Sequence, residues 1–564
     1  MKNKYICNDK TETLSRLMKY FHWIVLFLFF PALLLIHTSC REQYTDESGK
    51  VFRYNEAAGI SSLDPAFARD QANIWAVHQL FNGLVQLDTR LNICPAIAKS
   101  WEISPDGMKY TFHLRKDVFF HDDLVFPGGR GRRVNAHDFV FSFNRITNPR
   151  VASPGLWIFN YVSQEKGRYA FDASDDSTFI IRLNQAFPPF LGLLSTVYCS
   201  VVPMEAVAEY GQDFRKHPVG TGPFKFKLWK EGIKLVLVKN TRYFETYYGK
   251  RLPFLDGVAI TFLSDKQSAF LEFLKGRLDF MSGIDPTYKD ELLTPDGKLK
   301  PRYSGRFHMI TKPYLNTEYL GILMDTSLSE VNTSPLRLKK IRQAINYAFD
   351  RRKMIRFLRN NIGFPGINGI IPRGLPPYDS TSAGYDYNPE KARKLLAEAG
   401  YPDGKGMPPI TLTTTSDYLD ICKYLQNRLG EEGIQMKIEV SPPAAVKEMK
   451  AQAKLPFFRA SWIADYPDAE NYLSLFSTRN FCPNGPNYTR FSNPKFDKLY
   501  DISMAAVNDT LRQTCYHKMD SLIMEEAPVV ILYYDQVLRF VQSNIVGMEC
   551  DPMNLLDLRK VRKY

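Results

Sequence analysis

The chain has 564 residues, 45% hydrophobic and 24% charged; this is ordinary globular composition, and the length exceeds one ordinary core, so two or three domains are expected. Its net charge of +13 is spread along the sequence without a basic tail or basic helix, which argues against a nucleic-acid-binding protein. The sequence contains no GxSxG, HExxH or GxxxxGK[ST] motif, and we predict neither catalysis nor a cofactor.

The first 39 residues have the pattern of a targeting segment. Arg16 and Lys19 precede an apolar run over 24–36, which is short for a membrane span and suits the core of a signal peptide. Thr38-Ser39-Cys40 follows, and small residues before a cysteine resemble the bacterial lipoprotein cleavage box, in which Cys40 becomes the lipidated first residue. We predict a signal peptide over 1–39, starting at Met1 or Met18, and a polar tether over 40–50. An uncleaved anchor would also leave the rest outside the cytoplasm.

The predicted elements of the first half are strands and short helices. A strand at 51–54 precedes a helix at 73–87, and the turn Ser104-Pro105-Asp106-Gly107 precedes a strand at 109–115. Asn135 predicts the cap of a helix at 136–146. Further strands are expected at 179–183, 225–229, 234–239 and 258–262, and a helix at 264–275.

Two glycine-rich stretches have the composition of anion-binding loops. The basic stretch 126–133 is best explained as a solvated hairpin tip. Gly220-Thr221-Gly222-Pro223-Phe224 lacks the strand-to-helix context and the Lys-Ser/Thr ending of a phosphate loop. This second stretch therefore predicts a tight backbone crossing.

Metal-ligand and cysteine patterns are weak. His121-Asp122-Asp123 and His137-Asp138 have suitable ligand types, but adjacent residues on a hairpin rarely converge on one ion, so we predict no metal site. Six cysteines remain beyond Cys40 without a CxxC pair. One or two disulfides are possible in an oxidising compartment, and the sequence does not pair them.

The second half alternates strands and helices. Extended pieces at 308–323 flank Pro313, and 410–440 predicts a β-α-β unit with its helix at 419–432. Helices are expected at 336–349, 390–399, 495–504 and 511–525, and strands at 457–463 and 529–534.

The stretch 459–468 suggests a binding site. Arg459 lies on a short apolar strand, and Asp465 follows it about 20 Å along the backbone, too far for a direct ion pair. A short peptide, which is a zwitterion, would place its ammonium on Asp465 and its carboxylate near Arg459 while its backbone pairs with the strand. A buried strand whose end charges are solvated or paired locally explains the same residues, and these residues alone favour that interpretation.

Nine motifs stand in a fixed order and spacing: 62–65 (SLDP), 81–84 (FNGL), 98–102 (AKSWE), 110–116 (YTFHLRK), 135–140 (NAHDFV), 220–224 (GTGPF), 342–351 (RQAINYAFDR), 392–401 (ARKLLAEAGY) and 462–466 (WIADY). Together they resemble one protein family, the extracytoplasmic solute-binding proteins of family 5, which serve ABC importers of oligopeptides, dipeptides and nickel.

The resemblance implies a mixed α/β fold like that of periplasmic binding proteins, with two lobes that close on a cleft and three domains. The first domain is expected to be discontinuous. Its segments are 51–85, 206–310 and 529–564; the second domain is 86–205, and the third, the other lobe, is 311–528.

The resemblance also implies the site. Asp465 of the Trp-x-x-Asp segment would hold the peptide ammonium and Arg459 would meet its carboxylate. The strand residues Ala460, Ser461, Trp462 and Ile463 would pair with the peptide backbone. From the other lobe, Ala68, Arg69 and Asp70 would approach the ligand.

The predicted function is therefore that of a monomeric, lipid-anchored receptor in the periplasm or cell envelope, which delivers short peptides to an ABC permease. Three alternatives remain: the same fold with a nickel chelate or oligosaccharide as ligand, a peptide-sensing lipoprotein without transport, and a secreted hydrolase. The absence of a visible catalytic constellation argues against the hydrolase.

Overall fold

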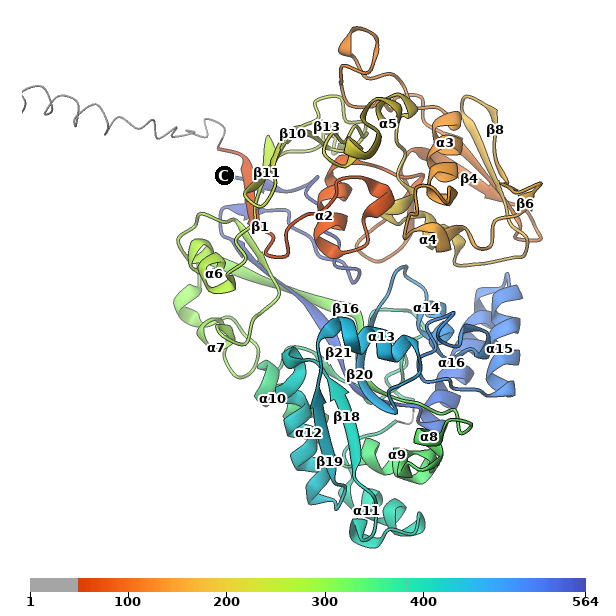
Figure 1. Cartoon of the computed structure of the whole chain (residues 1–564). Coiled ribbons are helices and arrows are strands. Elements are labelled where there is room, and N and C mark those ends of the chain that lie inside the picture. The colour runs from red at the N-terminus through yellow and green to blue at the C-terminus, as the bar shows by residue number, and fades with distance from the viewer. Residues whose placement is uncertain (1–48, 383) are drawn as a thin grey trace, which may run out of the picture. The chain divides into compact units, whose positions relative to one another are not determined.

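A computed structural model describes residues 49–382 and 384–564 (Figure 1). The predicted signal peptide, Cys40 and nearly all of the tether lie outside the described residues. The α-helices are α2 (Gln71–Leu80), α3 (Ala136–Thr147), α4 (Phe190–Leu194), α5 (Met204–Tyr210), α6 (Lys266–Leu274), α7 (Lys289–Leu292), α8 (Ser329–Asn332), α9 (Lys339–Tyr347), α10 (Arg351–Arg359), α11 (Pro389–Glu398), α12 (Leu419–Glu431), α13 (Pro443–Ala451), α14 (Glu470–Leu473), α15 (Pro494–Ala505) and α16 (Asp509–Glu526).

A mixed sheet of 11 strands is the centre of the fold. The first strand of the described chain, β1 (Val51–Asn55), pairs in parallel with β14 (Gly257–Thr261) and β15 (Phe280–Ser282). Segments about 200 residues apart in sequence therefore lie side by side. The order along the sheet is β10 (Phe224–Lys230), β11 (Lys234–Lys239), β14, β1, β15, β21 (Val529–Gln542), β16 (Phe307–Ile322), β20 (Phe457–Ile463), β18 (Ile410–Thr414) and β19 (Met436–Val440), with β17 (Phe364–Pro365) beside β21.

The two longest strands, β16 and β21, cross the middle of this sheet as an antiparallel pair (Figure 1). The extended pieces predicted around Pro313 belong to one strand, whose pairing shifts between Pro313 and Thr317. The predicted strand 529–534 continues to Gln542. The second half of this strand was not predicted, because the polar pair Asp535-Gln536 interrupts its apolar pattern.

A smaller sheet lies in the first half of the chain. Its order is β4 (Ala98–Ile103), β5 (Lys109–Leu114), β9 (Thr178–Arg182) and β8 (Phe171–Asp175). Helix α3 packs on it through Phe139 and Phe143, whose rings lie 5.7 and 5.4 Å from that of Phe179. Asn135 and Asp138 form the capping box that begins α3, as the sequence predicts. Four two-stranded ribbons complete the described strands: β2 (Val85–Leu87) with β3 (Ile93–Pro95), β6 (Gln164–Glu165) with β7 (Arg168–Tyr169), β12 (Thr246–Tyr247) with β13 (Lys250–Arg251), and β22 (Ile545–Val546) with β23 (Arg562–Lys563).

The predicted β-α-β unit is confirmed by β18, α12 and β19, in which both strands run parallel. Its apolar faces join a core shared with α9, α10 and α11. Strand β20 pairs along its whole length with β16 and touches β18 at a single pair, Phe458 with Thr413. Most of the second edge of β20 is therefore left without a neighbouring strand among the described residues.

The helix predicted at 73–87 is wrong at its end. Helix α2 begins after the cap Asp70 and stops at Leu80, and residues 85–87 form β2. The carbonyl of Leu80 accepts the N–H of Gly222 at 2.9 Å, so it is not free to extend the helix. The contact confirms the tight crossing predicted at 220–224: a Cβ on Gly222 would lie 2.5 Å from the carbonyl oxygen of Gln79.

The basic stretch 126–133 is not simply a solvated tip. Arg132 forms ion pairs with Asp138 and Glu205, both at 2.6 Å.

The six cysteines that the structure describes are free thiols. Across 49–382 and 384–564, no helix combines the length and apolarity that a membrane crossing requires.

Candidate functional site

A cavity of about 360 Å³ brings several of the predicted residues together. Ala68, Arg69 and Asp70 line it from the segment before α2, and Ile463 and Asp465 line it from the end of β20. Its other lining residues are Gln71, Ile74, Trp75, Leu87, Trp157, Ser195, Thr196, Val197, Tyr198, Tyr314, Ala464, Met553, Asn554 and Leu555. Residues from six distant parts of the sequence thus share one space.

Hydrogen bonds to the backbone around Asp465 fix its position. Strand β20 ends where the N–H of Ala464 donates to the carbonyl of Leu315 at 2.9 Å. The side-chain oxygen of Asn471 then accepts both the N–H of Asp465 at 3.3 Å and the indole N–H of Trp462 at 2.7 Å. Asn471 is buried, so the turn that presents Asp465 is anchored from inside the protein.

The carboxylate of Asp465 lacks a cationic partner. It keeps exposed surface inside the cavity, while the surrounding protein removes enough water to raise its pKa to about 6, against an opposing hydrogen bond from Asn471. No Lys, Arg or His in the described part of the chain lies within 4.0 Å of it. Asp465 can therefore bind a cation supplied by a ligand.

Aromatic side chains form the walls of this cavity. The ring of Trp157 lies 6.2 Å from that of Tyr466, next to Asp465 in sequence. Burial and the charge of Asp465 raise the pKa of Tyr198 to about 12, so its hydroxyl stays protonated. Gly155 leaves room for this ring, since a Cβ there would lie 2.6 Å from it. Such walls suit a ligand with apolar or aromatic parts.

The backbone of β20 offers unpaired groups beside the cavity. Even-numbered residues of β20 face β16: the N–H of Ala464 bonds to Leu315, and the carbonyl of Pro456 accepts from Leu323. Alternation along an antiparallel pair directs the amide and carbonyl groups of Ser461 and Ile463 to the opposite edge. That edge can accept an added strand.

Arg459 is placed differently from Asp465. It does not line the cavity, and its guanidinium forms an ion pair with Glu318 of β16 and lies 3.1 Å from the ring centre of Tyr418. The local pairing that the sequence offered as an alternative is thus found for Arg459 and not for Asp465. Ala460 is buried on the other face of the strand.

Two further cavities adjoin the first. One of about 480 Å³ shares Leu87, Ser195 and Leu555 with it. Another of about 400 Å³ shares Gln71, Trp75, Tyr314 and Asn554. The three cavities therefore lie next to one another, and together they are called the cleft below.

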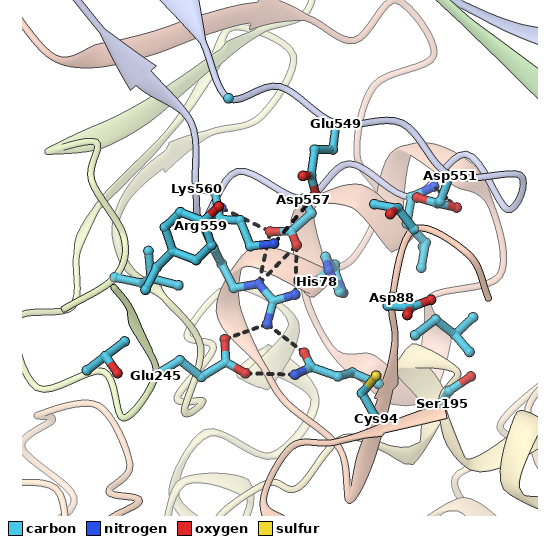
Figure 2. Close-up of a pocket in the computed structure, with 18 of the residues that line it drawn as sticks. His78, Asp88, Cys94, Ser195, Glu245, Glu549, Asp551, Asp557, Arg559 and Lys560 are labelled. Atoms are coloured by element: carbon cyan, nitrogen blue, oxygen red, sulfur yellow. Dashed lines mark hydrogen bonds and ion pairs between the residues drawn. The ribbon is translucent and has the colours of Figure 1, made fainter. Parts of the chain in front are cut away.

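The larger neighbour is charged, and its buried Arg559 is paired with carboxylates, whereas Asp88 and Asp551 form no ion pair within the described residues (Figure 2). Arg559 donates to Asp557 at 2.7 Å and to Glu245 and Gln86 at 2.5 Å each. Burial lowers the pKa of His78 beside this network. This cluster was not predicted, since its members come from three segments far apart in the sequence, 78–86, Glu245 and 557–559.

The His and Asp side chains that could have been metal ligands have other partners or are exposed in the structure. His121 bonds to the carbonyl of Gly222 at 3.0 Å, Asp138 pairs with Arg132, and His137 is exposed. Within the described ranges, no group of three or more His, Cys, Asp or Glu residues is arranged to hold a metal.

Trp157, Tyr198, Tyr314, Met553 and Asn554 were not predicted as site residues, although they line the cavity. Single aromatic residues in apolar surroundings have the same pattern in a core and in a pocket.

Comparison with known families decides the class of protein. The pattern of bacterial extracellular solute-binding proteins, family 5 (middle), matches residues 92–481, more than half of the chain. The chain belongs to this family. It is a solute-binding protein with a mixed α/β fold of the periplasmic binding protein type.

Curated relatives of this solute-binding protein differ in ligand. The glutathione-binding protein GsiB of Salmonella choleraesuis is 26% identical over 498 residues, covering 87% of this chain and 90% of that protein. The heme-binding protein A of Haemophilus influenzae is 27% identical over 520 residues, covering 87% and 88%.

Solved structures match over nearly the whole described chain. The periplasmic binding protein DppA of Helicobacter pylori, in complex with the peptide STSA, has a TM-score of 0.72 and 26% identity and covers 92% of this chain and 99% of its own. The Listeria monocytogenes protein CtaP has a TM-score of 0.76 at 23% identity, covering 91% and 99%; at that identity, the likeness shows the fold alone.

Proposed function

We propose that this solute-binding protein captures short peptides and delivers them to the permease of an ABC importer. The unpaired carboxylate of Asp465, lying in the cavity beside the free edge of β20, supports this most directly. A peptide offers an ammonium for Asp465 and amide groups for the outward backbone groups of Ser461 and Ile463. Because backbone pairing ignores side chains, one site can accept many peptides.

The proposal also includes where the protein works and how its two lobes move. The chain works outside the cytoplasm as a monomer, attached to a membrane through a lipid on Cys40. It binds without catalysis, and the domain boundaries predicted above delimit two lobes that close on the cleft. Closure strengthens the pairing of Asp465 with the ammonium by excluding water.

Other ligands are distinguished by the charge they bring. The relatives include glutathione-binding and heme-binding proteins, and a neighbouring structure holds Ni(L-His). Glutathione has a free ammonium and fits Asp465. A nickel chelate or an oligosaccharide does not require an anionic group without a partner at this position.

The proposal is tested by identifying what the protein retains and then removing the carboxylate. Native mass spectrometry of undenatured protein should show a ladder of short peptides. In calorimetry with a peptide so identified, Asp465→Asn should weaken binding by roughly 2–5 kcal/mol, because it leaves a buried ammonium unpaired.

Asp172→Asn is the matched control, since it changes an exposed carboxylate on β8 whose one ion pair within the described residues is with Arg182. It should bind like the unaltered protein. Retention of a single glycan or metal complex, or equal peptide binding by Asp465→Asn, would contradict the proposed function.

A further inference from the structure

We infer that this protein recognises the amino end of its peptide and not the carboxyl end, because Glu318 already occupies the guanidinium of Arg459. The inference rests on the proposed function and specifies its substrate class: peptides with a free amine, whether the carboxyl end is free, amidated or extended.

The first observation is the Arg459–Glu318 pair itself. Glu318 lies opposite Ser461 in the register of β16 and β20, so its side chain shares a sheet face with Arg459, two residues away. The two side chains are 12% and 5% exposed and form an ion pair. Tyr418 covers the guanidinium at 3.1 Å, which leaves little room for a second anion.

A neighbouring cation is neutralised in the same way. Arg359 of α10 pairs with Asp535 of β21 at 2.6 Å and donates to the hydroxyl of Tyr533 at 3.0 Å. The amide of Asn316 donates to Glu318 at 3.0 Å and to Asp535 at 3.4 Å, and so links the two pairs. Two cations and two carboxylates balance, and no positive charge remains for a ligand.

A ligand carboxylate would have to displace Glu318. The displaced carboxylate would stay buried with the amide of Asn316 as its remaining hydrogen-bond partner within the described residues, which is strongly unfavourable. Arg132 and Arg559 each hold two carboxylates in this protein, but the guanidinium of Arg459 is covered by the ring of Tyr418, which leaves little room for a second one. The Arg459–Glu318 pair therefore excludes the ligand's carboxyl end.

The other cations that line the three cavities offer a weak alternative. In the cavity of about 480 Å³, Arg115 is paired with Asp117 at 2.9 Å and Lys560 with Glu549 at 3.6 Å. Lys266, which lines the cavity of about 400 Å³, is paired with Asp285 at 2.9 Å. Arg69 lines the cavity of Asp465 and, like Asp465, keeps exposed surface; it forms no ion pair within the described residues that would hold its long side chain in one position. Exposed ion pairs contribute little, less than about fivefold in affinity. Asp465 at the amino end thus has no counterpart of equal strength at the carboxyl end.

The test compares free acids with carboxyl amides on the unaltered protein. Trialanine, tetraalanine and pentaalanine and their amides are titrated by calorimetry. We expect each amide to bind within about threefold of its acid. An amide more than about tenfold weaker than its acid would overturn this inference while leaving the proposed function standing. Failure of all free-amine peptides to bind would overturn both.

Glu318→Gln tests the residue responsible. It frees the guanidinium of Arg459 while keeping a side chain of similar shape, so an acid of matching length should gain at least about tenfold over its amide. Glu102→Gln, an exposed carboxylate on β4, should show no such preference. If Glu318→Gln folds and still treats acid and amide alike, Glu318 does not set the specificity; if it does not fold, the peptide pairs on the unaltered protein decide.

Discussion

Three carboxylates follow β20 within six residues, and they meet different partners. Asp468 accepts from Arg512 at 3.1 Å and from Tyr516 at 2.8 Å. Glu470 accepts from the hydroxyls of Tyr466 and Tyr500, and burial raises its pKa to about 7. Asp465 alone of the three lines the cavity with Arg69 and Trp157. At the residue scale, the proposed function therefore depends on which carboxylate is left unpaired.

The pKa of Asp465 predicts how peptide binding depends on pH. Because burial raises this pKa to about 6, about nine-tenths of the carboxylates are ionised at pH 7 and about one-tenth at pH 5. The peptide ammonium stays charged at both values. Affinity measured by calorimetry should therefore fall about tenfold from pH 7 to pH 5.

Asp465→Asn separates this effect from other titrating groups in the cleft, such as Asp551, whose pKa burial also raises to about 6. The variant should bind weakly and lose most of the pH dependence. An affinity that rises toward pH 5 in the unaltered protein would contradict the role assigned to Asp465.

At the scale of elements, the sequence predicts local structure well where one periodicity runs uninterrupted. Helix α3, strand β20 and the unit β18-α12-β19 agree with prediction because caps and apolar patterns mark them. Helix α2 ends early because a contact from Gly222, far along the chain, satisfies the carbonyl of Leu80. Asp465 was predicted from its motif, whereas the pairing of Arg459 depends on the register of β16, which the sequence does not specify.

The tight crossing of Gly222 over α2 predicts a strong effect on stability. In Gly222→Ala, the added Cβ would lie 2.5 Å from the carbonyl oxygen of Gln79, and backbone on both sides prevents easy adjustment. We expect a loss of roughly 3 kcal/mol or more in the free energy of unfolding, measured by denaturant titration.

The matched control is Gly430→Ala. Gly430 is exposed in α12, and a Cβ there meets no atom within 4 Å. This variant should be stabilised by roughly 0.5–1 kcal/mol, since alanine favours the helix. Equal stability of the two variants would contradict the tight crossing.

At the scale of the whole molecule, segments that are far apart in the sequence bond to one another. Lys563, the last residue but one, bonds to Asp279 at 2.8 Å, and Arg559 ties the end of the chain to Glu245 and Gln86 (Figure 2). The cleft is lined by residues from both ends and from the middle of the sequence. Such closures follow from the fold; resemblance to a family implied a discontinuous first domain, and these individual contacts were not predicted.

Chemical blocking of the peptide's amine tests the central claim most directly. An oligopeptide that binds the unaltered protein is compared with its N-acetylated form by calorimetry. Acetylation should weaken binding about 30-fold or more, because the carboxylate of Asp465 loses its partner. In Asp465→Asn, the two forms should bind nearly alike, as coupling between the two groups requires. Equal binding of both forms by the unaltered protein would contradict recognition of the amino end.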